Sequence, residues 1–461
     1  MHYKGRWSLL LTGLLAYTCT PSAQTAPVVE FISLEQATPV IRSFADSLPP
    51  DLPKLPVLNT TSWSSWLQTN DREIRARLDR GEEDTLTNLL RFGVTFTNEY
   101  RIDDQYLARY GESTLVNSFA ENRARDLVKA LAAPNPSEGL VRMRAFLEGK
   151  GFSLKTPEQR AKARQYLLAN LARMREDFLK YRSQTKDDTR FQLFKDRGIS
   201  LDTNLWPDFL LDEHFRQMKE KGLLQKGSVK RVAIIGPGLD FANKEKGNDF
   251  YPPQTIQPFA VLDSLLRLGL VDINSVELYT FDISQDVNFH IRRAKKNASA
   301  GQAYTVQLPW NTDARRDPAY RAKFIEYWEM LGDQIGHPVT PIPVPKAAAG
   351  TKERAVKIRP ELVGRITPVD MNIVFQRMRV ASEKAFDLII GTNIFVYYGE
   401  FEQSLARANV AAMLKNGGYL LTNDKLPDRV PSGLKASMTT IQTVARDPDI
   451  TEYMFCYERA D

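Results

Sequence analysis

The sequence predicts an α/β protein with a doubly wound, mostly parallel sheet and a C-terminal antiparallel hairpin, preceded by an all-helical domain. Three observations lead to this prediction. Short apolar runs rich in β-branched residues alternate with helical patterns from residue 230 to the end. Over residues 62–225 apolar residues return at helical spacing instead. A chain of 461 residues is also too long for one ordinary hydrophobic core.

Residues 1–23 have the layout of an export signal. Lys4 and Arg6 precede an apolar run over residues 7–16, and a small residue, Ala23, stands where cleavage would occur. The run is much shorter than the ~20 residues that span a bilayer, so no transmembrane helix is expected after its removal. We expect an exported protein, periplasmic or secreted, if the signal is functional, and a cytoplasmic one otherwise.

A linker or extended arm is expected over residues 24–61. A short helical pattern covers residues 38–48, and the Pro-rich stretch 49–56 cannot continue it. In the helical domain that follows, Thr156 can cap a helix, with Pro157 in the first turn and Gln159 reaching back to the cap. A long helix is predicted from that point.

The α/β domain is predicted over residues 230–461, with an insertion at about 285–360 that is either a cover for the site or a surface addition. Its expected strands share short apolar runs bounded by Gly or polar residues, and they cover 231–235, 276–281, 366–369, 386–391 and 418–422. Helices are expected over 259–268 and 401–414. Two further runs, 439–445 and 453–459, are expected to form the antiparallel hairpin.

Polar residues and glycines stand at the predicted strand ends. In a doubly wound sheet the ligand site lies at the carboxyl ends of the strands. The first strand leads into Gly236 and Gly238, which lack side chains that would keep a ligand from the backbone. Asp282 ends the second strand, where a carboxylate can accept both hydroxyls of a ribose. The residues that follow the next two strands and offer amide or hydroxyl groups are Asn372, Thr392 and Asn393.

Several of these stretches resemble class I S-adenosylmethionine-dependent methyltransferases, whose fold is Rossmann-like. The resemblance covers about half of the chain and is carried by VAIIGPG at 232–238, LYTFD at 278–282, FDLII at 386–390 and MLKNGGYLL at 413–421. A helix ending in Leu-Lys-x-Gly-Gly before an apolar strand is frequent in that superfamily and uncommon in dinucleotide dehydrogenases. The stretch TNIFVYY at 392–398 is similar to the corresponding part of chemotaxis-receptor carboxyl methyltransferases.

The resemblance implies a methyltransferase that uses S-adenosyl-L-methionine, with Tyr397 near the transferred methyl group as the catalytic residue. The residues that it places against the cofactor are Gly236, Gly238, Asp240, Asp282, Asn372, Thr392 and Asn393. Asp240 stands where the family often has a third glycine, so either the turn is wider or the Asp240 carboxylate faces the cofactor amino group. The methyl acceptor is expected to be a small molecule or a protein, and Asp240, Glu400 and His290 are candidates for a base.

Two other functions fit parts of the sequence. Gly-x-Gly followed by an acidic strand end also occurs in NAD(P)-dependent oxidoreductases, although the third glycine is absent and Asp282 comes later than the ~20-residue spacing of that fingerprint. An exported binding protein that keeps the fold without transfer chemistry is the other alternative, because S-adenosylmethionine is made in the cytoplasm.

Charge and composition argue against two classes of partner. The formal charge of +6 is small for the length, and Lys and Arg are interleaved with Asp and Glu, so nucleic acid is not expected. Four histidines, and a single cysteine after signal removal, Cys456, show none of the usual ligand spacings. The sequence therefore predicts no metal and no intramolecular disulfide.

Overall fold

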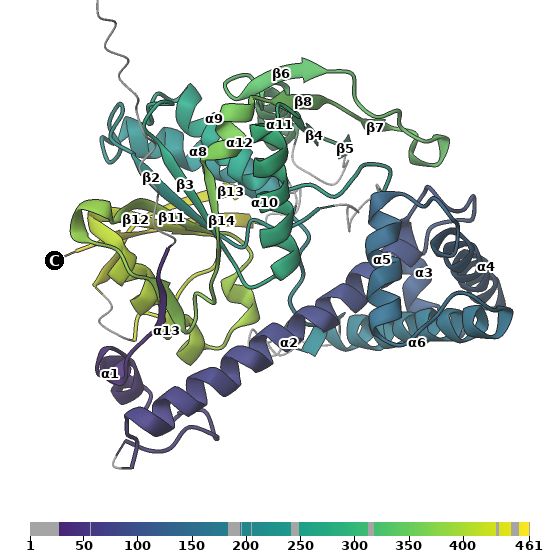
Figure 1. The fold of residues 1–461 in the computed structure, drawn as a ribbon, viewed down its shortest axis with the longest axis horizontal. Helices are drawn as coiled ribbons and strands as arrows, with labels where there is room; N and C mark the ends of the chain where they lie inside the picture. The colour runs from purple at the N-terminus through teal and green to yellow at the C-terminus, as the bar shows by residue number, and fades with distance from the viewer. Residues whose placement is uncertain are drawn as a thin grey trace, which may run out of the picture.

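The computed structural model describes residues 27–55, 57–182, 194, 196–203, 205–240, 249–311, 318–429, 433–443 and 451–460 (Figure 1). The predicted export signal, residues 1–23, lies outside these ranges. Within them, none of the helices combines the length and the apolar character that crossing a bilayer requires.

The secondary structure follows the predicted order of helices first and alternating strands and helices afterwards. The described α-helices are α1 (Leu34–Ser43), α2 (Thr60–Phe92), α3 (Asp104–Ala108), α4 (Thr114–Leu131), α5 (Glu138–Gly149), α6 (Pro157–Arg182), α8 (Leu205–Glu220), α9 (Gln257–Arg267), α10 (Gln285–Ser299), α11 (Pro318–Met330), α12 (Pro360–Arg365) and α13 (Glu400–Met413). The described strands are β1 (Val29–Phe31), β2 (Arg231–Ile235), β3 (Glu277–Asp282), β4 (Tyr304–Gln307), β5 (Trp310–Asn311), β6 (Gly336–Val339), β7 (Thr351–Lys352), β8 (Ala355–Ile358), β9 (Ile366–Asp370), β10 (Gln376–Met378), β11 (Phe386–Gly391), β12 (Leu414–Thr422), β13 (Leu434–Thr443) and β14 (Thr451–Arg459).

A seven-stranded sheet forms the centre of the C-terminal half, in the order β13-β14-β12-β11-β2-β3-β9. The five strands from β12 to β9 are parallel, and β14 pairs antiparallel with both β12 and β13. The chain order reverses between β2 and β11, which is the topological switch point at which doubly wound sheets bind ligands. The predicted doubly wound sheet and its antiparallel hairpin are confirmed.

Strand β2, near the middle of this sheet, is buried along its whole length because both faces are covered. In β2, Val232 and Ile234 pack into the core on one face, whereas Ala233 and Ile235 pack into the core on the other. All five residues of β2 are buried. Helices α8, α9 and α10 cover the first face, and α1, α13 and the N-terminal half of α2 cover the second (Figure 1).

The Leu-Lys-x-Gly-Gly motif lies at the edge of the sheet opposite the carboxyl ends of the strands. Lys415 forms an ion pair with Asp387 at the start of β11. The same Asp387 carboxylate accepts hydrogen bonds from the backbone N–H groups of Lys230, at 2.6 Å, and Arg231, at 2.8 Å. The motif therefore fixes the amino ends of three neighbouring strands. Strand β12 begins at Leu414, earlier than the predicted residue 418, because Leu414 already pairs with Phe386.

The stretch predicted as a linker or arm packs against the α/β part of the chain. Strand β1 pairs antiparallel with β10, and Ile32 and Ile41 are buried in the core on the second face of the sheet. Trp63 of α2 is 1% exposed, and its indole N–H donates a hydrogen bond of 2.9 Å to the carbonyl oxygen of Ile32. The helix predicted over 38–48 instead covers 34–43, so it ends before the Pro-rich stretch begins, and residues around that stretch are part of a hydrophobic core.

The connection from β9 to β11 explains why the N-terminal residues are needed there. The connecting residues, 371–385, hold β10 and a 3₁₀ turn but no α-helix. Parallel strands of a doubly wound sheet are usually joined by a helix that covers the sheet. Here Val374 and Phe375 of the connection are buried against α1 and α2 instead. The N-terminal helices thus supply the cover that the connection itself lacks.

Helices α3 to α6 and the C-terminal half of α2 form a helical bundle with its own hydrophobic core, which contains Leu89, Leu127, Met143 and Leu167. The predicted start of α6 is confirmed, because Thr156 and Gln159 exchange the two hydrogen bonds of a capping box. Helix α8 lies inside the predicted helical range 62–225 but packs on the sheet with α9. The division of the chain into domains at residue 225 stays a prediction.

Polar contacts join the helical bundle to the α/β part. Arg142 of α5 forms ion pairs with Glu82 of α2 and with Asp286 at the start of α10. Burial raises the pKa of the Glu82 carboxyl, which the Arg142 guanidinium opposes. Asp249 accepts a hydrogen bond of 2.8 Å from the backbone N–H of Val94, just after α2. The bundle therefore contacts the α/β part of the chain at two places, through Arg142 of α5 and through the residues just after α2.

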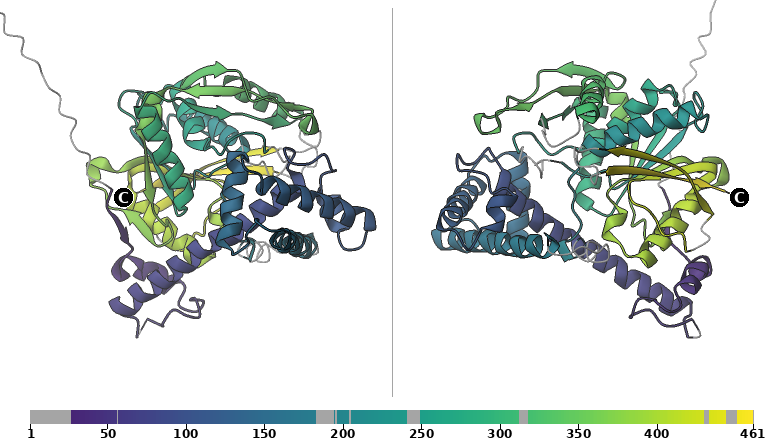
Figure 2. Two further views of the ribbon diagram at one scale, coloured as in Figure 1. Left: turned by 45° about the vertical axis from the view of Figure 1, so that its right-hand side comes forward. Right: turned by 180° about the vertical axis from the view of Figure 1, so that it is seen from behind.

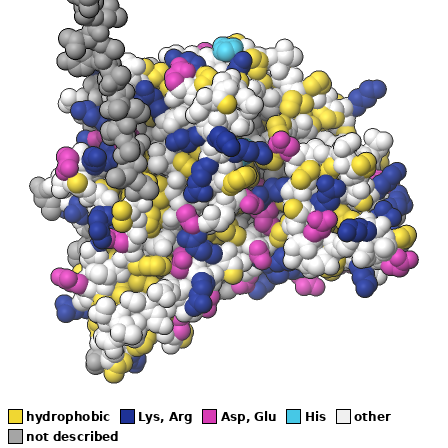
Figure 3. Space-filling model, in the orientation of Figure 1, with side chains coloured by type: hydrophobic (Ala, Val, Ile, Leu, Met, Phe, Trp, Pro, Cys, Tyr) yellow, Lys and Arg dark blue, Asp and Glu magenta, His cyan; other side chains and the backbone are white. Residues whose placement is uncertain are grey.

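The insertion between β3 and β9 forms a small separate sheet of β4, β8 and β6, beside α11 (Figure 2). Its aromatic residues Trp310, Tyr327 and Trp328 pack into the core that α8 and α9 share. On the face shown in Figure 3, basic and acidic side chains are interspersed, and no large area of one sign is visible.

Candidate functional site

A pocket lies at the carboxyl ends of β2, β3 and β11, beside the topological switch point. The turn after β2, the end of β3 and the residues that follow β9 and β11 line it. Three further parts of the chain complete the lining: Leu78 of α2, Gln257 of α9 and residues 199–203. The sequence predicted a site at this edge of the sheet, and the pocket lies there.

The glycine turn after β2 is shaped by close contacts. Gly236 and Gly238 have φ of +63° and +73°, in the left-handed region that favours glycine. A Cβ on Gly236 would lie 2.2 Å from Cδ1 of Ile394, and one on Gly238 would lie 2.7 Å from the carbonyl oxygen of Leu201. Both predicted glycines line the pocket; a side chain at Gly238 would meet backbone, whereas one at Gly236 would have to displace the end of the Ile394 side chain.

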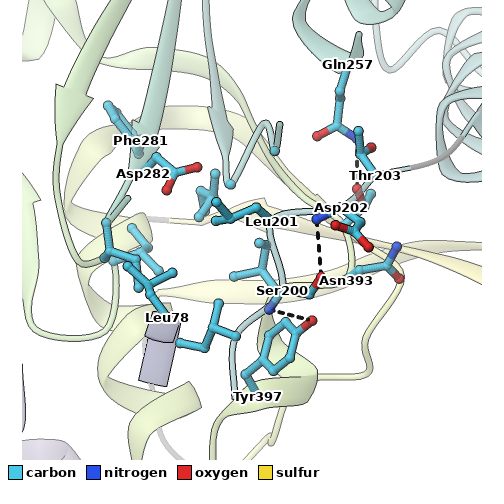
Figure 4. A pocket seen from close by; sticks show the side chains of 18 of the residues that line it. Leu78, Ser200, Leu201, Asp202, Thr203, Gln257, Phe281, Asp282, Asn393 and Tyr397 are labelled. Carbon is cyan, nitrogen blue, oxygen red and sulfur yellow. Dashed lines mark hydrogen bonds between the residues drawn. The ribbon is translucent and has the colours of Figure 1, made fainter. Parts of the chain in front are cut away.

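Asp282 ends β3 with its carboxylate toward the cavity (Figure 4). It is 6% exposed, and one carboxylate oxygen accepts a hydrogen bond of 2.7 Å from the backbone N–H of Ser284. Burial raises the pKa of this carboxyl to about 7, and the nearby Asp370 carboxylate acts in the same direction. The arrangement leaves a carboxylate that can accept hydrogen bonds from ligand hydroxyls.

The second carboxylate at this edge, Asp370 at the end of β9, is neutralised by α2. Arg75 donates to Asp370 at 2.7 Å, to Asp71 at 3.1 Å and to the carbonyl oxygen of Ile283 at 3.0 Å. Asp370 is absent from the described lining of the pocket. Helix α2 therefore holds the ends of β3 and β9 together while Asp282 faces the cavity.

The side chain of Asn372 turns away from the cavity. It is fully buried and donates a hydrogen bond of 2.7 Å to Asp71 of α2. Its neighbours Met371 and Ile373 line the pocket instead, together with Leu78. The result is an apolar slot next to Asp282. The predicted contact of Asn372 with a cofactor stays a prediction.

Two polar residues follow β11, as predicted. Thr392 accepts a hydrogen bond of 2.8 Å from the Gln257 side-chain amide, which also donates to Asp208 at 3.1 Å. Asn393 has φ of 58°, the one positive value at a described residue other than glycine. The side-chain oxygen of Asn423 accepts a hydrogen bond of 2.7 Å from the backbone N–H of Asn393. The side-chain amide of Asn423 donates one of 2.6 Å to the side-chain oxygen of Asn393. Both Thr392 and Asn393 line the pocket.

Tyr397 closes the 3₁₀ turn Phe395–Tyr397 and lines the pocket. Its hydroxyl oxygen accepts a hydrogen bond of 3.4 Å from the backbone N–H of Ser200 (Figure 4). The ring is thereby held against residues 199–203. Its predicted catalytic role stays a prediction.

Asp240 lies behind the glycine turn and is not part of the described lining. Its backbone N–H and C=O pair with those of Gln254 at 2.7 Å, and its carboxylate accepts a hydrogen bond of 3.0 Å from the Tyr251 hydroxyl. Burial raises the pKa of the Asp240 carboxyl to about 7. The expected contact of Asp240 with the cofactor amino group stays a prediction, and the structure gives this carboxylate a partner elsewhere.

The other two base candidates also point elsewhere. His290 is 3.0 Å from the Tyr304 hydroxyl, on the side of α10 that packs against the insertion. Burial lowers the pKa of His290 to about 4, so its imidazole is neutral near pH 7. Glu400 lies 3.6 Å from Arg429 at the start of α13. Neither side chain belongs to the described lining of the pocket.

Residues 199–203 and Gln257 are parts of the lining that the sequence did not reveal. The residues 199–203 have no regular secondary structure, and no motif distinguishes them. They bring Asp202 to the pocket, on the side opposite Asp282 (Figure 4). Among the described lining residues, Asp202 and Asp282 are the only ones with charged side chains. The described groups of the lining that can carry charge near neutral pH are therefore both carboxyl groups, and Asp282, with its pKa raised to about 7, is partly ionised there.

A metal site does not emerge from the described part of the chain. No group of three or more His, Cys, Asp or Glu side chains is arranged there so that it could hold a metal ion. Cys456 is buried in β14 and free.

Comparisons with known proteins find similarity in structure alone. No family model matches the chain, and no curated protein is similar to it. The N-methyltransferase NodS from Bradyrhizobium japonicum WM9 is similar at 12% identity and a TM-score of 0.27, over 54% of this chain and 98% of that one. Magnesium protoporphyrin IX methyltransferase ChlM from Synechocystis PCC 6803, solved with bound SAM, is similar at 11% identity and a TM-score of 0.25, over 60% of this chain and 86% of that one. The CcbJ methyltransferase from Streptomyces caelestis is similar at 11% identity and a TM-score of 0.27, over 55% of this chain and 96% of that one.

Proposed function

We propose that this chain binds S-adenosyl-L-methionine in the pocket at the switch point and transfers its methyl group to a small-molecule or protein acceptor. The observation that carries the proposal is the carboxyl of Asp282, which ends β3 and faces the cavity at the switch point. The other carboxyl group among the described lining residues is that of Asp202. S-adenosylmethionine carries a sulfonium, an ammonium and a carboxylate, so it is a net cation that such a pocket attracts.

The same two carboxyl groups argue against a dinucleotide. The pyrophosphate of NAD(P) carries two negative charges and usually sits on the N-terminus of a helix that starts at the glycine turn. Here the described residues that follow β2, 236–240, are not helical, and the first described helix after them, α9, begins at Gln257. Leu201 and Thr203 also lie against Gly238, where a pyrophosphate would approach.

The described lining combines apolar and polar side chains, both of which an adenosyl compound would contact. The side near Asp282 is apolar, with Leu78, Met371 and Ile373, and suits an adenine ring whose ribose hydroxyls bond to the carboxylate. The side near Asp202 is polar. Methyl transfer is an in-line displacement at a sulfonium carbon, so it depends on alignment and exclusion of water. Residues 199–203, which cover the glycine turn, would contribute that exclusion.

Isothermal titration calorimetry of the protein with S-adenosylhomocysteine and, separately, with NAD tests the proposal. We expect micromolar binding of S-adenosylhomocysteine and no detectable binding of NAD at the same concentrations. Binding of NAD alone would support the oxidoreductase. Absence of both would favour a binding protein that retains the fold without the cofactor.

The affinity for S-adenosylhomocysteine is expected to rise about tenfold between pH 6 and pH 8. The pKa of Asp282 is raised to about 7, so its carboxyl is mostly protonated at pH 6 and mostly ionised at pH 8. Ionisation of a group with this pKa goes from about 10% to about 90% over that range, and the charged form is the better hydrogen-bond acceptor. Titration calorimetry in matched buffers measures the effect. The Asp282→Asn variant should show no such rise, and a rise of equal size in that variant would assign it to another group.

We also propose that the N-terminal signal directs export, on the sequence pattern alone. Expression of the full chain in a bacterial host should give a mature protein that begins near residue 24. N-terminal sequencing of the protein recovered from the periplasm or medium measures this. A product that starts at Met1 and remains in the cytosol would contradict the proposal and would place the protein where the cofactor is made.

A further inference from the structure

The polar side of the pocket is built by a segment that belongs neither to the sheet nor to the predicted motifs. Residues 199–203 run across the glycine turn between α6 and α8. The backbone N–H of Leu239 donates a hydrogen bond of 2.8 Å to the carbonyl oxygen of Leu201. A Cβ on Gly238 would lie 3.2 Å from Cβ of Thr203. The segment is therefore in direct contact with the turn over which the sulfur-bearing part of an adenosyl compound would lie.

Helix α2 fixes this segment at two points. The backbone N–H of Ile199 donates a hydrogen bond of 3.1 Å to the carbonyl oxygen of Arg77. Gly81 allows the approach, because a Cβ there would lie 1.8 Å from the carbonyl oxygen of Ile199. One turn further along α2, the Thr85 hydroxyl lies 3.4 Å from the Asp202 carboxylate and 3.1 Å from the Gly81 carbonyl oxygen, and its single proton is shared between these two acceptors. The position of Asp202 is thus set by the same helix that holds the ends of β3 and β9.

Asp202 and Asp282 lie on opposite sides of the pocket (Figure 4), and Gly236 and Gly238 belong to the same lining. If Asp282 bonds to the ribose, the adenine extends toward the apolar slot at Leu78. The amino-acid end of the ligand then points the other way, across Gly236 and Gly238, toward Asp202. That end of S-adenosylmethionine carries an ammonium group, and a carboxylate is the side chain that pairs with it.

We propose that the Asp202 carboxylate binds the ammonium group of the cofactor's amino-acid end. This inference rests on the function proposed above and deepens it, because it names the group that distinguishes S-adenosylmethionine from other adenine nucleosides. The specificity comes from a segment held by α2, outside the doubly wound sheet.

A comparison of two ligands in wild type and Asp202→Asn tests the inference by titration calorimetry. S-adenosylhomocysteine has the amino-acid end, and 5′-methylthioadenosine shares the adenosine and the sulfur but lacks it. A hydrogen bond to a charged group contributes about 1.5–3 kcal/mol, which corresponds to roughly 10- to 150-fold in affinity. We expect Asp202→Asn to lower the affinity for S-adenosylhomocysteine by that factor. The affinity for methylthioadenosine should stay within about threefold of the wild-type value.

The control variant is Asp46→Asn, which removes the same charge from an exposed position after α1 and should change neither affinity. Retained binding of methylthioadenosine shows that the variant pocket is folded. An unchanged affinity of Asp202→Asn for S-adenosylhomocysteine would overturn the inference. Equal losses for both ligands would also overturn it, since Asp202 would then act on the shape of the pocket. If wild type binds methylthioadenosine and S-adenosylhomocysteine equally, the inference fails while the proposed cofactor site stands. If wild type binds neither, the proposed function itself fails.

Discussion

Replacement of Trp63 by alanine is expected to lower the free energy of unfolding by about 3–5 kcal/mol, which is the usual cost of removing a large buried aromatic side chain. The side chain is 1% exposed and stacks on Trp66 with 5.3 Å between ring centroids. The variant also loses the hydrogen bond to the Ile32 carbonyl oxygen, which fastens the N-terminal residues to α2. Because single domains are stable by only about 5–15 kcal/mol, this is a large share of the total.

Chemical denaturation followed by far-ultraviolet circular dichroism measures the loss at Trp63. Val57→Ala is a suitable control, since Val57 is 69% exposed in the same N-terminal stretch and should change the free energy by less than about 0.5 kcal/mol. A loss below about 1 kcal/mol for Trp63→Ala would mean that residues 27–63 contribute little to the core and are closer to the linker that the sequence predicts.

The Asp282→Asn variant is expected to bind S-adenosylhomocysteine about 100-fold more weakly than wild type. Two hydrogen bonds from ribose hydroxyls to a carboxylate are weakened in the variant, and each such bond contributes about 1.5–3 kcal/mol. Since S-adenosylhomocysteine and methylthioadenosine share the ribose, the affinity for methylthioadenosine should fall by the same factor. This pattern differs from that of Asp202→Asn, which should affect S-adenosylhomocysteine alone. Titration calorimetry of both ligands separates the two carboxylates.

The ligand-free Asp282→Asn variant is expected to be more stable than wild type at pH 8, and by a smaller margin at pH 5. The folded-state pKa of Asp282 is raised from 3.8 to about 7, so the stability linked to its protonation is lost progressively as the pH rises from 3.8 to about 7. Asparagine removes the buried charge and can still accept the hydrogen bond from Ser284. Denaturation at the two pH values measures this. A variant that is less stable at pH 8 would show that the Asp282 carboxylate supports the fold rather than the ligand.

The parts of the fold that depend on local pattern could be predicted from the sequence. Strand β11 has the predicted bounds, 386–391, because a fully buried parallel strand is a continuous apolar run. The positions of Gly236, Gly238 and Asp282 followed from the rule that ligands bind at the carboxyl ends of strands. These features need only the order of the strands, which the sequence shows.

The parts that depend on contacts between distant residues could not be predicted. Strand β1 pairs with β10 across most of the chain, and a short run such as Val29–Phe31 carries no sign of its partner. The turn of Asn372 toward Asp71 depends on where α2 lies. Asp202 enters the pocket because Gly81 admits the backbone of Ile199, and only the packed structure shows that approach.

The packing of α1 and the N-terminal half of α2 on the second face of the sheet affects the order of folding. Residues 27–78 are synthesised before the sheet, and Trp63, Trp66 and Ile74 pack in a core whose strand residues come later in the chain. Contacts between residues so distant in sequence form slowly, since a long loop must close first. The helical bundle can gather its own core early, while the apolar side of the N-terminal helices stays open until β11 has been made. The growing chain therefore exposes this apolar surface for most of its synthesis. Exposed apolar surfaces of this kind are aggregation-prone and are bound by chaperones.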